Sequence, residues 1–160
     1  MELLIVIVIL GILITLGGAS FTGSQKKGRD SKRKADLRNI AVALEQYYTD
    51  KGQYPGDNNS PTGKIYACGT GGTSLCDWGY PFIDQNTVVY MLKLPDDPIG
   101  ALGYYYDAIP AQGLIKSYQL YAHLENTEDP EIITPNNTSL TGTSCGSACN
   151  YGVASSATTP

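Results

Sequence analysis

A run of apolar residues at the start of the chain constrains its fold more than any other feature. Residues 1–16 read MELLIVIVILGILITL, in which Glu2 is the only ionisable side chain and Gly11 interrupts the apolar run between Leu3 and Ile14. A charged side chain in the middle of an apolar environment is costly, about 2.5–3.5 kcal/mol at the centre of a bilayer even on lenient insertion scales. The run therefore predicts a helix that is buried against other apolar groups, and Glu2 requires a partner of opposite charge.

Three ordinary interpretations of this run remain open on the sequence. A helix buried in a core is possible, although no polar positions mark an exposed face. A secretory signal peptide would use Gly18-Ala19-Ser20 as its cleavage site, but the residues before the apolar run include a carboxylate and no Lys or Arg. A simple membrane anchor needs roughly 20 apolar residues, so Leu3–Leu16 is too short unless residues before or after it also lie in the membrane.

The charge of the chain is divided unevenly along its length. The 160 residues, enough for one domain with an appendage, carry a net charge of −4. Residues 1–38 hold seven Lys and Arg against three carboxylates, whereas residues 39–160 hold four against twelve. We expect the basic residues to form a solvated helix face, with anionic headgroups or the acidic heads of neighbouring molecules as the alternative partners. No aromatic pattern or fold motif accompanies them, so no specific nucleic-acid partner is predicted. The basic residues are Lys26, Lys27, Arg29, Lys32, Arg33, Lys34 and Arg38.

A second helical signal follows the basic residues. Apolar side chains recur at spacings of three and four from Leu37 through Ile40 and Leu44 to Tyr47 and Tyr48, which is typical of an amphipathic helix. Gly52 is a suitable C-terminal stop, and Pro55 prevents continuation. Residues 1–52 are therefore predicted to form one long helix, apolar in its first half and amphipathic in its second.

Residues 53–160 are predicted to form a loop-rich globular head. Residues 56–87 are expected to be a long connection, packed onto the head by Trp78, Tyr80 and Phe82, and residues 88–94 a short helix that ends at Pro95. Residues 103–107 and 118–124 are expected to be antiparallel strands, with the turn at residues 111–113. From Asn126 the sequence becomes polar, and residues 155–160 are expected to be disordered.

The four cysteines form two local pairs, Cys68 with Cys76 and Cys145 with Cys149, in segments rich in Gly, Ser and Thr. Such a pattern indicates disulfides made in an oxidising compartment. Three connectivities are possible, and loop-closure entropy favours the near neighbours. Zinc is the rival explanation, but these spacings are unusual for a zinc site and His123 is the only histidine.

Several stretches together resemble the type IV pilins and the related major pseudopilins. They are residues 2–7 (ELLIVI), 10–13 (LGIL), 29–40 (RDSKRKADLRNI), 44–48 (LEQYY) and 52–55 (GQYP). The resemblance covers roughly the first third of the chain and implies an α+β pilin fold, in which a long N-terminal helix is packed by a C-terminal head with a small antiparallel sheet and long loops. It also implies that a leader and about three residues of the mature family chain precede Met1.

The resemblance implies a function as well. Glu2 would neutralise the amino terminus of a neighbouring subunit, and the assembly residues would be Glu2, Leu3, Leu4, Ile5, Val6 and Gly11. The partners would be identical subunits in a helical homopolymer, the inner membrane before assembly, a prepilin peptidase, and the filament assembly machinery. The mature N-terminus would be methylated, and the subunit would move from the inner membrane to an extracellular filament on the cell surface. The segment between Gly11 and Gly23 is expected to break or stretch in the filament and to be more nearly continuous in an isolated subunit.

Three functions therefore compete on the sequence. The preferred one is a structural subunit of an extracellular type IV pilus-like filament. The alternatives are the major pseudopilin of a type II secretion system and a single-pass anchored adhesin or receptor domain that never polymerises. No catalytic motif is present, so an enzyme is not expected.

Two weaker signals concern ligands and modification. Asp96, Asp97 and Asp107 bracket the loop where some major pseudopilins hold calcium, but a solvated turn is the preferred interpretation and no cofactor is expected. Asn58, Asn136 and Asn137 match the acceptor pattern for N-glycosylation, which is a weak signal.

Overall fold

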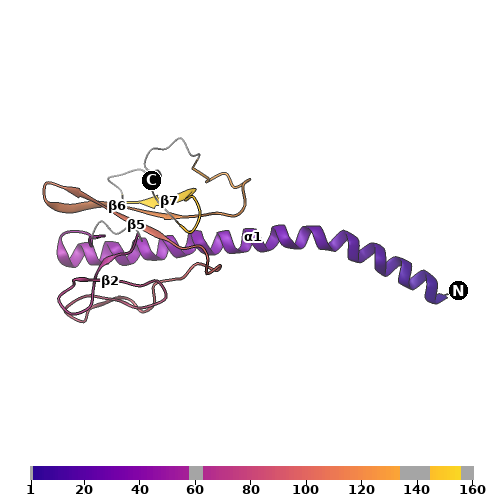
Figure 1. The fold of residues 1–160 in the computed structure, drawn as a ribbon, viewed down its shortest axis with the longest axis horizontal. Coiled ribbons are helices and arrows are strands. Elements are labelled where there is room, and N and C mark those ends of the chain that lie inside the picture. The colour runs from indigo at the N-terminus through magenta and orange to yellow at the C-terminus, as the bar shows by residue number, and fades with distance from the viewer. Residues whose placement is uncertain (1, 58–62, 134–144, 156–160) are drawn as a thin grey trace.

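The fold is α+β: one long helix carries along its second half a head whose described elements after α1 are strands. The computed structural model describes residues 2–57, 63–133 and 145–155, and the side chains of residue 2 and of residues 13–21 are outside the description. Helix α1 runs from Glu2 to Lys51. At 1.5 Å per residue its 50 residues span about 75 Å. Figure 1 shows its N-terminal half projecting away from the head and its C-terminal half enclosed between strands.

Helix α1 ends where the sequence predicts. Gly52 has a φ of 73°, and its backbone N–H donates to the Tyr48 carbonyl at 2.8 Å. Glycine adopts this left-handed conformation without a steric penalty, which suits it to close a helix. The chain then turns back, because Tyr54 N–H donates to the carbonyl of Ile115 in the sheet.

Three small antiparallel sheets surround the second half of α1. Strand β1 (Tyr66–Cys68) pairs with β2 (Ser74–Leu75), and β3 (Phe82–Ile83) pairs with β4 (Val89–Met91). The third sheet has the order β5 (Tyr105–Ala111), β6 (Leu114–Ala122) and β7 (Tyr151–Ala154). In Figure 1 this three-stranded sheet lies on one side of α1, and the segment that contains β2 lies on the other.

The turn between β5 and β6 follows from its residues. Gln112 and Gly113 have φ values of 53° and 81°, so both central residues of this two-residue loop are left-handed. Such turns match the twist of paired strands. The predicted antiparallel pair and its turn are therefore confirmed, but the strands run over residues 105–111 and 114–122 rather than 103–107 and 118–124.

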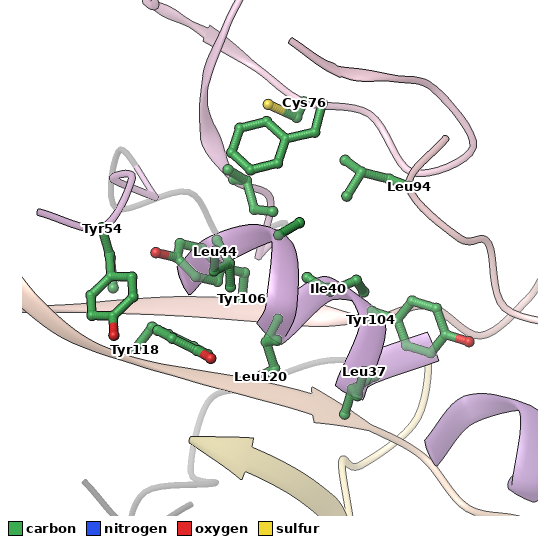
Figure 2. Close-up of a cluster of buried hydrophobic side chains, with 14 of the residues drawn as sticks. Leu37, Ile40, Leu44, Tyr54, Cys76, Leu94, Tyr104, Tyr106, Tyr118 and Leu120 are labelled. Atoms are coloured by element: carbon green, nitrogen blue, oxygen red, sulfur yellow. The ribbon is translucent and has the colours of Figure 1, made fainter. Parts of the chain in front are cut away.

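The core is built from the amphipathic half of α1 and the tyrosines of the sheet (Figure 2). Leu37, Ile40 and Leu44 are fully buried, as their spacing predicts. From the sheet, Tyr106 and Tyr118 contribute rings with centroids 6.1 Å apart, in a stacked arrangement. Aromatic side chains bury large areas, which lets a head with short strands form a core.

Three predictions for the head are wrong. Residues 88–94 contain strand β4 and no helix, because Val89 and Met91 pair with β3 and Tyr90 is buried beside Phe82. The supposed connection over residues 56–87 holds strands β1, β2 and β3. Within it Tyr80 is exposed, whereas Phe82 is buried and the half-buried Trp78 packs edge-on against Tyr104.

Strand β7 was not predicted at all. Tyr151 and Val153 alternate with small residues, and the strand completes the sheet against β6. The expectation of a disordered tail over residues 155–160 is wrong for Ser155, which is buried and whose backbone N–H donates to the Tyr118 carbonyl at 3.2 Å. The other five positions, residues 156–160, lie outside the described residues. The three glycosylation patterns also lie outside them.

Candidate assembly surface and helix–head junction

The first ten described side chains of α1, those of residues 3–12, form an apolar surface that no other described part of the chain covers. Every large apolar side chain from Leu3 to Ile12 is at least half exposed, with Leu3 at 80% and Ile9 at 51%. The exposure extends all round the helix, and a side chain built at Gly11 would meet no atom within 4 Å. A helix that is apolar all round is stable in water only when another surface buries it.

The assembly residues named from the sequence lie together at this end. Leu3, Leu4, Ile5, Val6 and Gly11 are all exposed on α1. Glu2 begins the helix, but its side chain lies outside the description. In the part of the chain that the structure describes, no helix combines the length and apolar character needed to cross a membrane.

The projecting half of α1 is joined to the head by a buried cluster of charges, which we call the junction cluster: Arg29, Asp30, Arg33, Asp97 and Glu125. Arg33 lies at its centre with a fully buried side chain. Its guanidinium contacts Asp97 at 2.6 Å, Asp30 at 2.7 Å and Glu125 at 2.8 Å. Arg29 makes a two-pronged contact with Glu125 at 2.7 and 2.6 Å. Such paired, hydrogen-bonded geometry is what makes buried charge tolerable.

The junction cluster also satisfies backbone groups of the head. The Asp30 carboxylate accepts from the backbone N–H groups of Glu125 and Asn126, at 3.0 and 2.8 Å. Asp97 accepts from the backbone N–H of Ile99 at 2.7 Å. One turn of α1 thereby fixes the segment that follows β6, and through the contact of Arg33 with Asp97 it also fixes the loop before β5.

The electrostatics favour the charged forms of Glu125 and Arg33. Hydrogen bonds from Arg29, opposed by burial and supported by Arg33, lower the pKa of Glu125 from 4.5 to about 2. The carboxylates raise the pKa of Arg33 although burial opposes them. Glu125 and Arg33 are therefore both charged at neutral pH.

Further polar contacts fasten the helix to the head on both sides of the cluster. The Tyr104 hydroxyl donates to the buried Asp36 carboxylate at 2.8 Å, and Lys34 contacts Asp129 at 2.7 Å. At the end of α1, Lys51 contacts the buried Asp84 at 2.6 Å. Together these contacts hold the second half of α1 rigidly against the head.

The expectation of a solvated basic face is thus wrong for three of its seven members. Arg29, Arg33 and Lys34 bind carboxylates of the head of the same chain, and only Lys26, Lys27, Lys32 and Arg38 are exposed. The sequence contains a signal for this. Asp30 and Arg33 continue the stripe of Leu37, Ile40 and Leu44 at spacings of three and four, and charges on a buried stripe indicate an internal ion pair.

The cysteines pair as loop closure favours. Disulfides join Cys68 to Cys76 and Cys145 to Cys149, and the described part of the chain holds no free cysteine. The first bridges the hairpin of β1 and β2, and the second packs with Tyr121 and Tyr105 on the outer face of the sheet. Gly146, with a φ of 77°, cannot take a side chain, because a Cβ there would overlap the carbonyl of Ala101.

The three weak calcium candidates have separate surroundings. Asp97 belongs to the junction cluster, whereas Asp107 lies beside Asp57, where burial and that carboxylate raise its pKa. Asp96 is exposed and lies against Gly79. No group of three metal-binding side chains is found within the described residues.

Comparisons with known proteins identify no relative. No protein-family model matches the chain, and searches of curated proteins and of solved structures found no match.

Proposed function

We propose that the protein is a structural subunit that polymerises through α1 into a type IV pilus-like extracellular filament. The observation that supports this most is the bare apolar surface from Leu3 to Ile12, carried on a helix that the head holds rigidly by its other end. Identical helices packed along a common axis bury such a surface on all sides. The resemblance of residues 2–7, 10–13, 29–40, 44–48 and 52–55 to pilins supports the same arrangement.

In this proposal the two halves of the molecule have different tasks. The exposed half of α1 is the core of the filament, with Glu2 paired to the amino terminus of a neighbour. The head covers the outside, and its disulfides fit an extracellular location. The precursor is held at the inner membrane, processed by a prepilin peptidase and delivered to the filament by an assembly machinery.

The junction cluster gives the proposal a mechanical basis. A subunit pulled or packed by its N-terminal helix transmits the load to its head through Arg29 and Arg33. Because these charges are buried and several bonds act together, they resist salt better than exposed pairs do.

Electron microscopy of the full chain, expressed in cells with a type IV filament assembly system, tests the proposal. We expect filaments from the wild type and a loss of filaments from Ile7→Lys, since an unpaired charge in the core costs on the order of 3 kcal/mol per subunit, about a hundredfold in association. Leu114→Lys is the matched control, because Leu114 is also exposed but lies at the β5–β6 hairpin, far from the apolar surface.

The result that contradicts the proposal is equally clear. Ile7→Lys forming filaments in the same yield as Leu114→Lys would show that the surface from Leu3 to Ile12 is not a filament core. A wild-type chain that stays monomeric under these conditions would favour an anchored domain.

A further inference from the structure

Helix α1 has a short exposed segment between its apolar end and the junction cluster. We call this segment, residues 22–28 (TGSQKKG), the neck, and every one of its residues is exposed. The neck holds two cations, Lys26 and Lys27, and no carboxylate. Its two ammonium groups are therefore in contact with whatever surrounds the molecule.

Within the described residues, the two lysines of the neck have no counter-charge, since neither makes an ion pair. The first carboxylate of α1 after residue 2 is Asp30, which is buried against Arg33. The carboxylates of the head that contact residues 29–34 are already paired with the two arginines and Lys34 there. The neck thus keeps a positive charge that these head carboxylates do not neutralise.

The uncharged stretch before the neck lysines matches the thickness of a bilayer. No ionisable side chain occurs from Leu3 to Gln25, a stretch of 23 residues. In one continuous helix these residues measure about 35 Å at 1.5 Å per residue. The hydrocarbon layer of a bilayer is about 30 Å thick, and each headgroup region adds roughly 5–7 Å. With Leu3 at one boundary of the hydrocarbon, residue 23 lies at the other. Lys26 and Lys27 then lie about 5 and 6 Å beyond that boundary, at the depth of the headgroups.

The residues between the apolar surface and the neck are compatible with this placement. The described residues alone contain no helix that could cross a membrane. Residues 13–21 contribute only Leu, Ile, Thr, Gly, Ala, Ser and Phe, so they lengthen the uncharged stretch. A serine or threonine hydroxyl in a helix can donate to a backbone carbonyl of the preceding turn, which satisfies it in hydrocarbon.

The chemistry at this depth selects an anionic partner. A lysine can lay its aliphatic stem along apolar surface while its ammonium reaches the phosphate groups of the headgroups. A zwitterionic headgroup carries a positive charge of its own, whereas an anionic headgroup leaves the phosphate charge uncompensated. Near an anionic surface each lysine contributes about a fivefold gain in binding.

We propose that Lys26 and Lys27 of the membrane-held precursor bind the headgroups of anionic phospholipids at one face of the bilayer. This inference rests on the membrane-held precursor of the proposed function and adds to it a class of lipid. Three observations carry it: the exposure of the neck, the lack of a counter-charge among the described residues, and the distance of one hydrocarbon layer from Leu3.

Electron paramagnetic resonance of spin-labelled lipids tests the proposal on the full chain reconstituted in bilayers of phosphatidylcholine. The fraction of label whose motion the protein restricts gives the relative affinities for spin-labelled phosphatidylglycerol and spin-labelled phosphatidylcholine. We expect phosphatidylglycerol to bind at least threefold more strongly in 0.1 M salt. The ratio should fall toward one in 1 M salt, because the screening length drops from about 10 to about 3 Å.

Two double variants locate the preference on the chain. Lys26→Gln with Lys27→Gln should bind the two lipids equally. Lys93→Gln with Lys116→Gln is the matched control, which removes the same charge from exposed positions of the head and should behave like the wild type. Because all four lysines are exposed, thermal unfolding of both variants should stay close to that of the wild type, which excludes misfolding as the cause of a loss.

Equal affinity of the wild type for the two lipids would overturn the inference. A preference that survives in the neck variant, or that the head control loses to the same extent, would overturn it too.

Filament yield from the same chains separates this inference from the proposed function. A wild type that prefers phosphatidylglycerol but forms no filaments would overturn the polymer and leave the lipid contact standing. A neck variant that loses filaments, while the wild type shows no lipid preference, would assign the two lysines to acidic side chains of a neighbouring subunit and overturn the lipid contact.

Discussion

Among the residues of the junction cluster, Arg33 contributes most to the attachment of α1 to the head. It is fully buried and contacts three carboxylates from three parts of the chain. A single arginine can do this because its planar guanidinium offers donors in several fixed directions, which a lysine cannot match.

We predict that Arg33→Met destabilises the protein by about 3–5 kcal/mol, because it leaves Asp30 and Asp97 buried without a cation. Chemical denaturation monitored by tyrosine fluorescence measures the loss. Lys32→Met, one residue away and exposed, is the control and should change the free energy of unfolding by less than about 0.5 kcal/mol. Equal effects of the two changes would show that the junction cluster contributes nothing.

The lowered pKa of Glu125 predicts how the free energy of unfolding depends on pH. Its pKa is about 2 in the folded chain and 4.5 in the reference state. A lowered carboxyl pKa means that stability is fully present above the unfolded pKa and is lost as pH falls through the folded one. We therefore expect the free energy of unfolding to hold from pH 7 to about 5 and to fall between about 4.5 and 2. Glu125→Gln should flatten this fall, and an unchanged slope in that variant would assign the acid sensitivity to other carboxylates.

At the scale of elements, α1 has two parts that serve different surroundings. The part over residues 29–51 is fixed by the core and the junction cluster, whereas Figure 1 shows the helix before it projecting away from the head. The structure has α1 as one continuous helix through Gly11, Gly17, Gly18 and Gly23. This agrees with the expectation for an isolated subunit, since nothing beside it replaces the backbone hydrogen bonds.

We predict that the same segment is broken or stretched in the assembled filament. Helix propensity is lowest there, since each glycine costs about 1 kcal/mol relative to alanine, and helices crowded along one axis must shift to fit. The backbone hydrogen bonds through residues 15–24 in a filament reconstruction are the measurement. An uninterrupted ladder would instead assign these glycines to close packing between helices.

At the scale of the whole molecule, the apolar N-terminal half of α1 is joined through the junction cluster to an acidic head. Among the described residues, the apolar side chains of residues 3–12 stay exposed while the head has a buried core, so this end of α1 presents a surface that requires a partner. Assembly of identical copies satisfies that requirement without a second protein.

We predict that Glu2→Ala leaves the head folded but lowers filament yield severely. In the proposed filament the carboxylate would neutralise the amino terminus of a neighbour within the core, where an unpaired charge is costly. Circular dichroism of the head and filament yield by sedimentation form the pair of measurements. Filaments in normal amounts from Glu2→Ala would contradict this role for the glutamate.

Local patterns determined much of this protein. The spacing of Leu37, Ile40 and Leu44 specified the amphipathic half of α1, Gly52 its end, the residues at 111–113 the turn, and the short separations of the cysteines their pairing. Each of these depends on contacts within about ten residues, so the sequence contains the whole cause. Only the tertiary structure decided the secondary structure of residues 88–94. A short apolar stretch takes the conformation that its neighbours allow, and here β3 is available as a strand partner. The tertiary structure also determined which basic residues are exposed and which form ion pairs. Arg33 binds carboxylates rather than water because of Asp97 and Glu125, which lie 64 and 92 positions further along the chain.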